Sequence, residues 1–344
     1  MTYLLLQGDA RHIPLADESV NCVVTSPPYW GLRDYGVSGQ LGLEPTPDEY
    51  VAHMVEVFRE VRRVLKPTGT CWLNIGDSYA SSLRSGRDRA PGVGTDQSIA
   101  PVRTGVKWHA GDGSKFRWTI PVSGGEIKPK DLCMIPARVA LALQAEGWWL
   151  RSDIIWHKPN PMPESVTDRP TRSHEYVFML TKSARYWYDN EAIKEPVAAS
   201  TIGRGPVDFG GAKGRDYKPE RGDPNFRNGK EQWGRTFDYA ESCKTGRNSR
   251  DVWTIATSPY KGAHYATMPP KLAERCILAG CPLGGIVFDP FDGSGTTVAV
   301  AVKLGRRGIG LDLNPKYLAE NAEPRVAAVA PMMALSLGVP DGPH

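Results

Sequence analysis

Residues 286–297 read IVFDPFDGSGTT. An apolar run that ends at Asp289 leads into a turn with two glycines and then into residues that suit a helix, which predicts a strand, a tight turn and a helix. Such a turn lets a ligand approach the backbone, and the start of the helix favours an anionic group such as a carboxylate. The turn is neither a G-x-G-x-x-G fingerprint nor a P-loop, because no Gly-Lys-Ser/Thr follows.

A further apolar run, from Gly308, ends at Asp312. An acidic residue after the second strand of such a unit commonly binds ribose hydroxyls. The turn and this acid together indicate a nucleoside-binding α/β domain, whereas the glycine turn alone fits a purely structural role equally well.

Strands and helices alternate along the rest of the chain. Apolar spacing predicts a helix over 47–65, whose start is marked by a capping box of Thr46 and Glu49. A strand over 70–75 follows, so with 20–25 it forms a strand–helix–strand unit with parallel strands. The unalternating runs at 3–6 and 20–25 predict strands buried on both faces. The other expected elements are strands over 149–156, 175–180, 285–288 and 308–311, and helices near 136–146, 270–279, 296–304 and from 315.

Residues 25–30, where the second of these strands ends, read TSPPYW. Two prolines fix the backbone and donate no N–H, while their carbonyl oxygens remain free to accept hydrogen bonds. The hydroxyl of Ser26 and the carbonyl of Pro27 lie side by side and can accept both hydrogens of an amino group. Tyr29 offers a ring on which a flipped base can stack. An ordinary proline turn is the alternative.

Composition restricts the class of protein and its partners. The 344 residues suit one large α/β domain with insertions, or one domain plus a smaller lobe. No apolar run is long enough to cross a membrane and no signal peptide is expected, which predicts a cytoplasmic protein. The six cysteines show no metal-ligand spacing, so reduced, packed cysteines and no metal site are expected.

Positive charge gathers in one part of the chain. Residues 204–250 hold eleven basic and seven acidic side chains, and eleven minus seven leaves +4, equal to the net charge of the whole chain. This distribution suits a region that contacts phosphates, although a solvated surface loop has the same composition. Residues 80–130, rich in Gly, Ser and Arg, are expected to form an inserted loop that is mobile without ligand.

The two motifs resemble those of the DNA methyltransferases that methylate exocyclic amino groups, adenine-N6 or cytosine-N4. Ser26 to Tyr29 matches the catalytic Asp/Asn/Ser-Pro-Pro-Tyr/Phe/Trp motif, and Asp289 to Thr297 matches Asp-Pro-Phe-x-Gly-Ser-Gly-Thr-Thr, with Asp292 at the variable position. The catalytic motif comes first, as in the circularly permuted beta subgroup. The resemblance extends over nearly the whole chain and implies a class I methyltransferase-like (Rossmann-like) α/β fold with a mostly parallel sheet.

The same resemblance assigns roles to residues. It implies S-adenosyl-L-methionine as cofactor, with Asp9 at its adenine, Asp312 at its ribose and His264 at its methionine end. The full cofactor set is Asp9, Thr25, His264, Asp289, Phe291, Gly293, Ser294, Gly295, Thr296 and Asp312, and the catalytic set is Ser26, Pro27, Pro28 and Tyr29. Segments 156–163 and 165–175 resemble the chain beside the target-base pocket.

We divide the chain into a catalytic half (1–195), a target-recognition segment (196–250) and a cofactor-binding half of the same domain (251–344). Double-stranded DNA is the expected partner, contacted through Arg215, Lys218, Arg221, Arg227 and Arg235. The resemblance allows a homodimer and a cognate restriction endonuclease as further partners without requiring either.

Ser26 favours cytosine-N4 over adenine-N6 as the target, because in this family serine usually accompanies cytosine methylation. No covalent intermediate is needed, so no catalytic cysteine is expected. Three alternatives remain open at this point: a protein glutamine methyltransferase, a non-catalytic DNA-binding module and a dinucleotide oxidoreductase, the last disfavoured by the missing third glycine.

Overall fold

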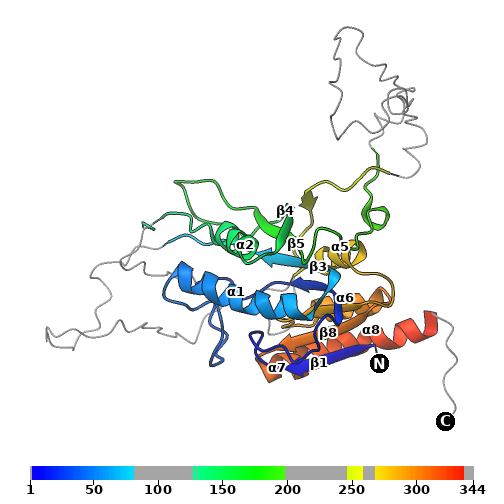
Figure 1. Ribbon diagram of the computed structural model, residues 1–344. Helices are drawn as coiled ribbons and strands as arrows, with labels where there is room; N and C mark the ends of the chain where they lie inside the picture. The colour runs from blue at the N-terminus through cyan, green and yellow to red at the C-terminus, as the bar shows by residue number, and fades with distance from the viewer. Residues whose placement is uncertain (1, 81–126, 129, 198–245, 259–267, 337–344) are drawn as a thin grey trace, which may run out of the picture.

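An eight-stranded sheet forms the centre of the molecule, shown as a computed structural model in Figure 1. The structure describes residues 2–80, 127–128, 130–197, 246–258 and 268–336. The strand order is β1 (Tyr3–Gln7), β8 (Arg307–Asp312), β7 (Ile286–Asp289), β2 (Val20–Thr25), β3 (Leu65–Ile75), β5 (His174–Thr181), β4 (Trp149–His157) and β6 (Val252–Thr254). Of these strands only β5 runs against the others, so the sheet is mostly parallel, as expected.

Helices cover both faces of the sheet. On one face lie α1 (Pro47–Val64) and α2 (Ile135–Ala145), and on the other lie α5 (Pro270–Gly280), α6 (Thr296–Lys303) and α8 (Glu323–Ser336). The short elements are η1 (Glu191–Ile193), α7 (Pro315–Tyr317) and a π-helical turn, η2 (Leu318–Ala322). Alternate residues of β2 serve the two faces, since Val23 packs on the α1 side and Val24 on the α5 side. The protein therefore has one hydrophobic core layer on each face of the sheet, and β2 contributes side chains to both.

Most predicted elements are present within one or two residues of their expected ends. The helix over 47–65 is confirmed as α1, and the Thr46 hydroxyl accepts from the Glu49 N–H at 3.2 Å. The strand–helix–strand unit is confirmed too, because β2 and β3 pair in parallel. Five cysteines are free and buried; Cys243 lies outside the described residues. No described helix has the length and apolar character of a membrane span.

The first strand corrects one expectation. β1 is an edge strand that pairs only with β8 among the described strands, and it is not buried on both faces. Leu4 is 41% exposed on this strand. A short apolar run thus predicted a strand correctly but not its position in the sheet, which depends on pairing with a distant segment. The small three-residue strand β6 was not predicted at all.

Two segments outside the described residues have ends that lie close together. Around 81–126, Tyr79 bridges Leu132, and the Ala80 N–H donates to the Asp131 carbonyl at 2.9 Å. Around 198–245, Glu195 and Arg247 exchange two backbone hydrogen bonds of 2.8 and 2.9 Å. The expected inserted loop over 80–130 and most of the target-recognition segment fall in these two ranges. In both cases the described residues on the two sides are joined by backbone hydrogen bonds.

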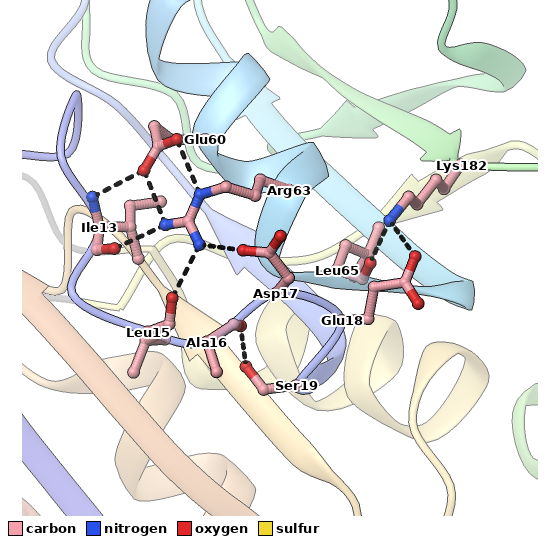
Figure 2. Close-up of polar contacts among 10 residues, drawn as sticks. All are labelled: Ile13, Leu15, Ala16, Asp17, Glu18, Ser19, Glu60, Arg63, Leu65 and Lys182. Atoms are coloured by element: carbon pink, nitrogen blue, oxygen red, sulfur yellow. Dashed lines mark hydrogen bonds and ion pairs between the residues drawn. The ribbon is translucent and has the colours of Figure 1, made fainter.

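Arg63 joins the last turn of α1 to the connection between β1 and β2 (Figure 2). Its guanidinium donates to the carboxylates of Glu60 and Asp17, at 2.8 and 2.6 Å, and to the carbonyls of Ile13 and Leu15, at 2.7 and 2.9 Å. The hydrogen bonds that Arg63 donates to Glu60, and then those to Asp17, raise the pKa of Arg63 above its ordinary value. A fork of fixed donors is required to reach four acceptors in different directions.

We expect Arg63→Lys to lower the free energy of unfolding by about 1–3 kcal/mol, because an ammonium cannot replace the fork and leaves polar groups without partners. Urea unfolding measures the change. Arg59→Lys is the matched control, since Arg59 lies one turn earlier on α1 and pairs with Glu146 at an exposed position. Equal effects of the two substitutions would contradict the role given to Arg63.

Candidate active site

A cleft of about 890 Å³ opens where β2, β7 and β8 end. The carboxyl ends of parallel strands meet at one edge of a sheet, and this edge is where α/β proteins bind ligands. Ser26 to Tyr29 follow β2, and the loop 290–296 follows β7, so the two sequence motifs line the same cleft. They are brought together because β2 and β7 are neighbours, with Cys22 opposite Val287 and Val23 opposite Phe288.

Asp289 ties the two motif strands and the following helix together. Its carboxylate accepts from the hydroxyls of Thr25 and Thr297, both at 2.7 Å, and from the Phe291 N–H at 3.0 Å. Asp289 is 4% exposed and Thr25 is fully buried. Burial raises the pKa of Asp289, and these hydrogen bonds offset the rise only in part. The two residues thus fix the floor of the cleft.

The glycine loop has the geometry of a ligand cradle. Gly293 and Gly295 have φ values of 52° and 74°, which side chains disfavour, and a Cβ on Gly295 would lie 2.8 Å from the Ala322 backbone. The Gly293 N–H donates to the Asp312 carboxylate at 2.9 Å, and the Asn314 N–H donates to the same group at 2.8 Å. Asp312 therefore stands at the turn, as expected of an acid that follows the second strand.

Asp292 occupies the variable position of the motif and is buried, with 5% exposure. Neither carboxylate oxygen has a hydrogen-bond partner among the described residues. Burial, and then the nearby carboxylates of Asp289 and Asp312, raise the pKa of Asp292 well above its ordinary value. The space that the carboxyl fills is left by Gly310, because a Cβ there would lie 2.3 Å from Asp292 Oδ2. Three carboxyl groups thus gather beside the loop, each with a raised pKa, and a cationic ligand placed there would favour their charged forms.

We expect Asp292→Asn to stabilise the protein without ligands by about 1–3 kcal/mol at pH 7–8, because a buried carboxylate without partners is costly. The pKa of Asp292 is raised on folding, so its favourable contribution is full below about pH 4 and is lost as pH rises. The advantage of the variant should therefore vanish near pH 4. Thermal unfolding from pH 4 to 8 measures it. A variant destabilised equally at all pH values would contradict this account.

The Ser-Pro-Pro-Tyr turn is held from outside the cleft. Tyr50 of α1 donates to the Pro28 carbonyl at 2.8 Å, and the Leu32 N–H donates to the Tyr29 carbonyl at 3.2 Å. No described residue donates to the Pro27 carbonyl. Ser26 and Pro27 both line the cleft, and Ser26 Oγ lies 3.4 Å from Tyr29 Oη and 3.3 Å from the Asn74 amide nitrogen.

The hydroxyl of Tyr29 belongs to a polar network. It donates to Glu175 at 2.7 Å and accepts from the Asn74 amide at 2.9 Å, and it lies 3.4 Å from Ser26 Oγ. Lys158 forms an ion pair with the other oxygen of Glu175 and lies over the ring of Trp156. Burial raises the pKa of Tyr29 well above its ordinary value, and the charge of Glu175 adds to this rise.

The structure brings together most of the predicted site. All four predicted catalytic residues line the cleft, as do seven of the ten cofactor residues: Asp9, Asp289, Phe291, Gly293, Ser294, Thr296 and Asp312. Thr25 and Gly295 lie behind the lining and support it. Asp9 is paired with Arg11 at 2.6 Å. His264 and the predicted DNA contacts at Arg215, Lys218, Arg221, Arg227 and Arg235 lie outside the described residues.

Several residues of the site were given no role by the sequence, among them Asn74, Asp292 and lining residues between Leu32 and Leu41. Asn74 is the penultimate residue of β3, and a polar residue in its apolar second half is the only signal that could have singled it out. Asp292 was passed over because it stands at a variable position. Lys158 and Glu175 lie in the segments expected beside the target base, but their link to Tyr29 depends on the pairing of β3, β5 and β4.

Comparison with known proteins identifies the family. Residues 20–323 match the N6_N4_Mtase family, described as DNA methylase. The chain belongs to this family. The methylase is 43% identical over 315 residues to Type II methyltransferase M.SmaI of Serratia marcescens, an alignment that covers 91% of this chain and 87% of that protein. It is 42% identical over 316 residues to M.Cfr9I of Citrobacter freundii, covering 91% and 84%.

Solved structures confirm the fold of the methylase. The PvuII DNA methyltransferase (cytosine-N4-specific) aligns with a TM-score of 0.57 at 18% identity, over 97% of this chain and 93% of that one. A protein of Thermus thermophilus, named as a putative DNA modification methylase and complexed with S-adenosyl-L-methionine, aligns with a TM-score of 0.53 at 23% identity, over 96% and 95%. The Rossmann-like methyltransferase fold expected from the motifs is thus confirmed.

Proposed function

We propose that this methylase transfers a methyl group from S-adenosyl-L-methionine to the N4 amine of a cytosine flipped out of double-stranded DNA. The observation that carries the proposal is the position of Ser26 and Pro27 in one cleft with the glycine loop 290–296. Adenine N6 is the alternative target, because it is also an exocyclic amine on an aromatic ring.

The cleft fits the cofactor by charge and by shape. Asp289, Asp292 and Asp312 bring three carboxyl groups beside a loop whose glycines let a ligand approach the backbone, and a cationic cofactor would favour their charged forms. In this proposal Asp312 holds the ribose, Asp9 the adenine, and the loop from Phe291 to Thr296 the methionine part, with His264 at its end. When bound, the cofactor supplies a methyl group activated on a positively charged sulfur.

The residues of the catalytic turn prepare the amine. Its lone pair is conjugated with the ring, which makes it a poor nucleophile. Ser26 Oγ and the Pro27 carbonyl oxygen accept its two hydrogens, favour tetrahedral geometry and localise the lone pair on nitrogen. Tyr29 lines the same cleft and offers its ring to the flipped base, which offsets the few kcal/mol that flipping costs. Positioning and electrostatics supply most of the catalysis.

Serine at position 26 supports cytosine over adenine, through the family pattern described above. A hydroxyl is a weaker hydrogen-bond acceptor than a carboxylate, but this difference alone does not distinguish cytosine from adenine as the target base. Likeness to the PvuII enzyme establishes the fold alone, so its named specificity does not decide the target here.

Nucleoside analysis tests the product directly. DNA methylated by the protein is digested and examined by mass spectrometry, and we expect N4-methyldeoxycytidine. N6-methyldeoxyadenosine as the sole product would overturn the cytosine assignment and leave the family intact. Ser26→Ala should lose about 100-fold or more in methylation rate with cofactor affinity retained, because one amine acceptor is removed. A fully active Ser26→Ala variant would overturn the mechanism.

The basic segment is proposed to bind the DNA backbone. Charge reversal at Arg215, Lys218, Arg221, Arg227 and Arg235 should weaken DNA binding and flatten its salt dependence, by about one unit of slope per lost phosphate contact. Arg307→Glu serves as a control, since Arg307 is exposed at the opposite end of the sheet from the cleft. Unchanged DNA affinity and salt slope after the fivefold reversal would show that the segment is a passive loop.

The cellular setting extends this proposal. The two bacterial relatives above are named Type II methyltransferases. If a cognate restriction endonuclease accompanies this chain, its role is the modification half of a restriction-modification system. The homodimer, the cytoplasmic location and the three-part division of the chain remain predictions from the sequence.

A further inference from the structure

Methylation of an amine releases one proton, and a buried site needs a group that accepts it. We propose that Glu175 is this group and that the proton reaches it from the amine through the hydroxyls of Ser26 and Tyr29. This inference rests on the proposed role of Ser26 but not on the choice between cytosine and adenine. It adds Glu175 to the site as a proton acceptor and gives Tyr29 a second role beside base stacking.

The hydroxyls point in one direction along this path. Ser26 Oγ donates to Tyr29 Oη at 3.4 Å, and Tyr29 Oη donates to Glu175 Oε2 at 2.7 Å. When Ser26 Oγ takes a proton from the amine, its own proton passes to Tyr29 Oη, whose proton passes to Glu175. One N–H bond breaks and one carboxylic O–H bond forms, while both hydroxyls end as they began. The long first contact needs to shorten only modestly once an amine is bound.

Asn74 holds the members of the path together. Its amide nitrogen lies 2.9 Å from Tyr29 Oη and 3.3 Å from both Ser26 Oγ and Glu175 Oε2. A carboxylate only accepts hydrogen bonds, so the amide must turn its nitrogen toward Glu175 and its oxygen away. Asn74 Oδ1 is then left buried with no partner among the described residues, in a side chain that is 3% exposed. A buried amide oxygen without a partner costs stability, and a purely structural core residue would not need to bear this cost. We therefore assign Asn74 the role of positioning Tyr29 and Glu175.

Glu175 connects the path to solvent. Lys158 pairs with its other oxygen, and the two side chains are 16% and 19% exposed, so the outer end of the path reaches water. The groups that face Glu175 come from three elements: Tyr29 from the turn after β2, Asn74 from β3 and Lys158 from the end of β4. Asn74, beside the middle of the path, is 3% exposed, and Ser26 at the inner end lines the cleft.

The ring of Tyr29 fits at this position because residue 76 is glycine. A Cβ on Gly76 would lie 2.5 Å from Tyr29 Cε2, so only glycine leaves room for the ring at this point. The ring therefore packs against the backbone after β3, and its hydroxyl meets Asn74 and Glu175.

The test compares two tyrosines whose hydroxyls form hydrogen bonds at the same turn. Tyr29→Phe removes the hydroxyl from the path, whereas Tyr50→Phe removes the hydroxyl that bonds the Pro28 carbonyl and leaves the path complete. In single-turnover methylation of DNA we expect Tyr29→Phe and Glu175→Gln each to slow the reaction about 100-fold. Tyr50→Phe should slow it much less, and the double variant Tyr29→Phe/Glu175→Gln should be no slower than the slower single variant, because a relay fails as a unit.

A second measurement needs neither cofactor nor DNA. If Tyr29 and Glu175 are coupled as the structure shows, the losses in melting temperature of the two single variants should exceed, when added, the loss of the double variant. Affinity for S-adenosyl-L-methionine should stay within about twofold in all three, which separates loss of proton transfer from loss of the cofactor site.

Full activity of Tyr29→Phe or Glu175→Gln would overturn the relay, as would equal losses in Tyr29→Phe and Tyr50→Phe. These outcomes are distinct from failure of the proposed function. If Ser26→Ala is inactive while the two relay variants are fully active, the acceptor role of Ser26 stands and only the relay fails. If Ser26→Ala is fully active, both fail.

Discussion

The buried carboxylate of Asp289 joins three elements on which the cleft depends. It receives the hydroxyl of Thr25 at the end of β2 and that of Thr297 in α6, while its own backbone closes β7. A buried carboxylate is costly unless hydrogen bonds surround it, so the arrangement holds only when all three elements are in place. The ends of the two motif strands are consequently fixed relative to each other.

The pairing of β2 with β7 explains why motifs near opposite ends of the chain work together. Each strand carries its motif at its carboxyl end, and parallel pairing directs both ends to the same edge of the sheet. The order of the motifs along the chain is therefore of little consequence for the site. What matters is that the strands are neighbours, and a permuted chain preserves this relation.

The middle of the chain completes the site from the other side. β3, β5 and β4 place Asn74, Glu175 and Lys158 around the hydroxyl of Tyr29. On the cofactor side, Asp292 is buried with two oxygens that lack partners among the described residues. Natural proteins tolerate such polar groups where they serve a site rather than the core, because each costs stability. The cleft thus joins a cluster of three carboxyl groups at the glycine loop to a hydrogen-bonded network at the turn that follows β2.

Local signals in the chain were enough to predict the class of fold, most strands and helices, and the two motifs. Helical spacing that begins at Thr46 marks α1, an unalternating apolar run marks β2, and glycines after Asp289 mark the ligand loop. Each signal acts over a few neighbouring residues, so it can be read without knowing the fold. Resemblance to a family then located most of the cleft lining.

Other features follow only from the packing of distant segments. β1 is an edge strand, Thr25 is buried behind the cleft, and Asn74 and Glu175 meet at Tyr29. Each of these facts depends on which strands become neighbours. The free energy that selects those neighbours comes from burial and pairing across the whole sheet, which no local pattern of residues contains.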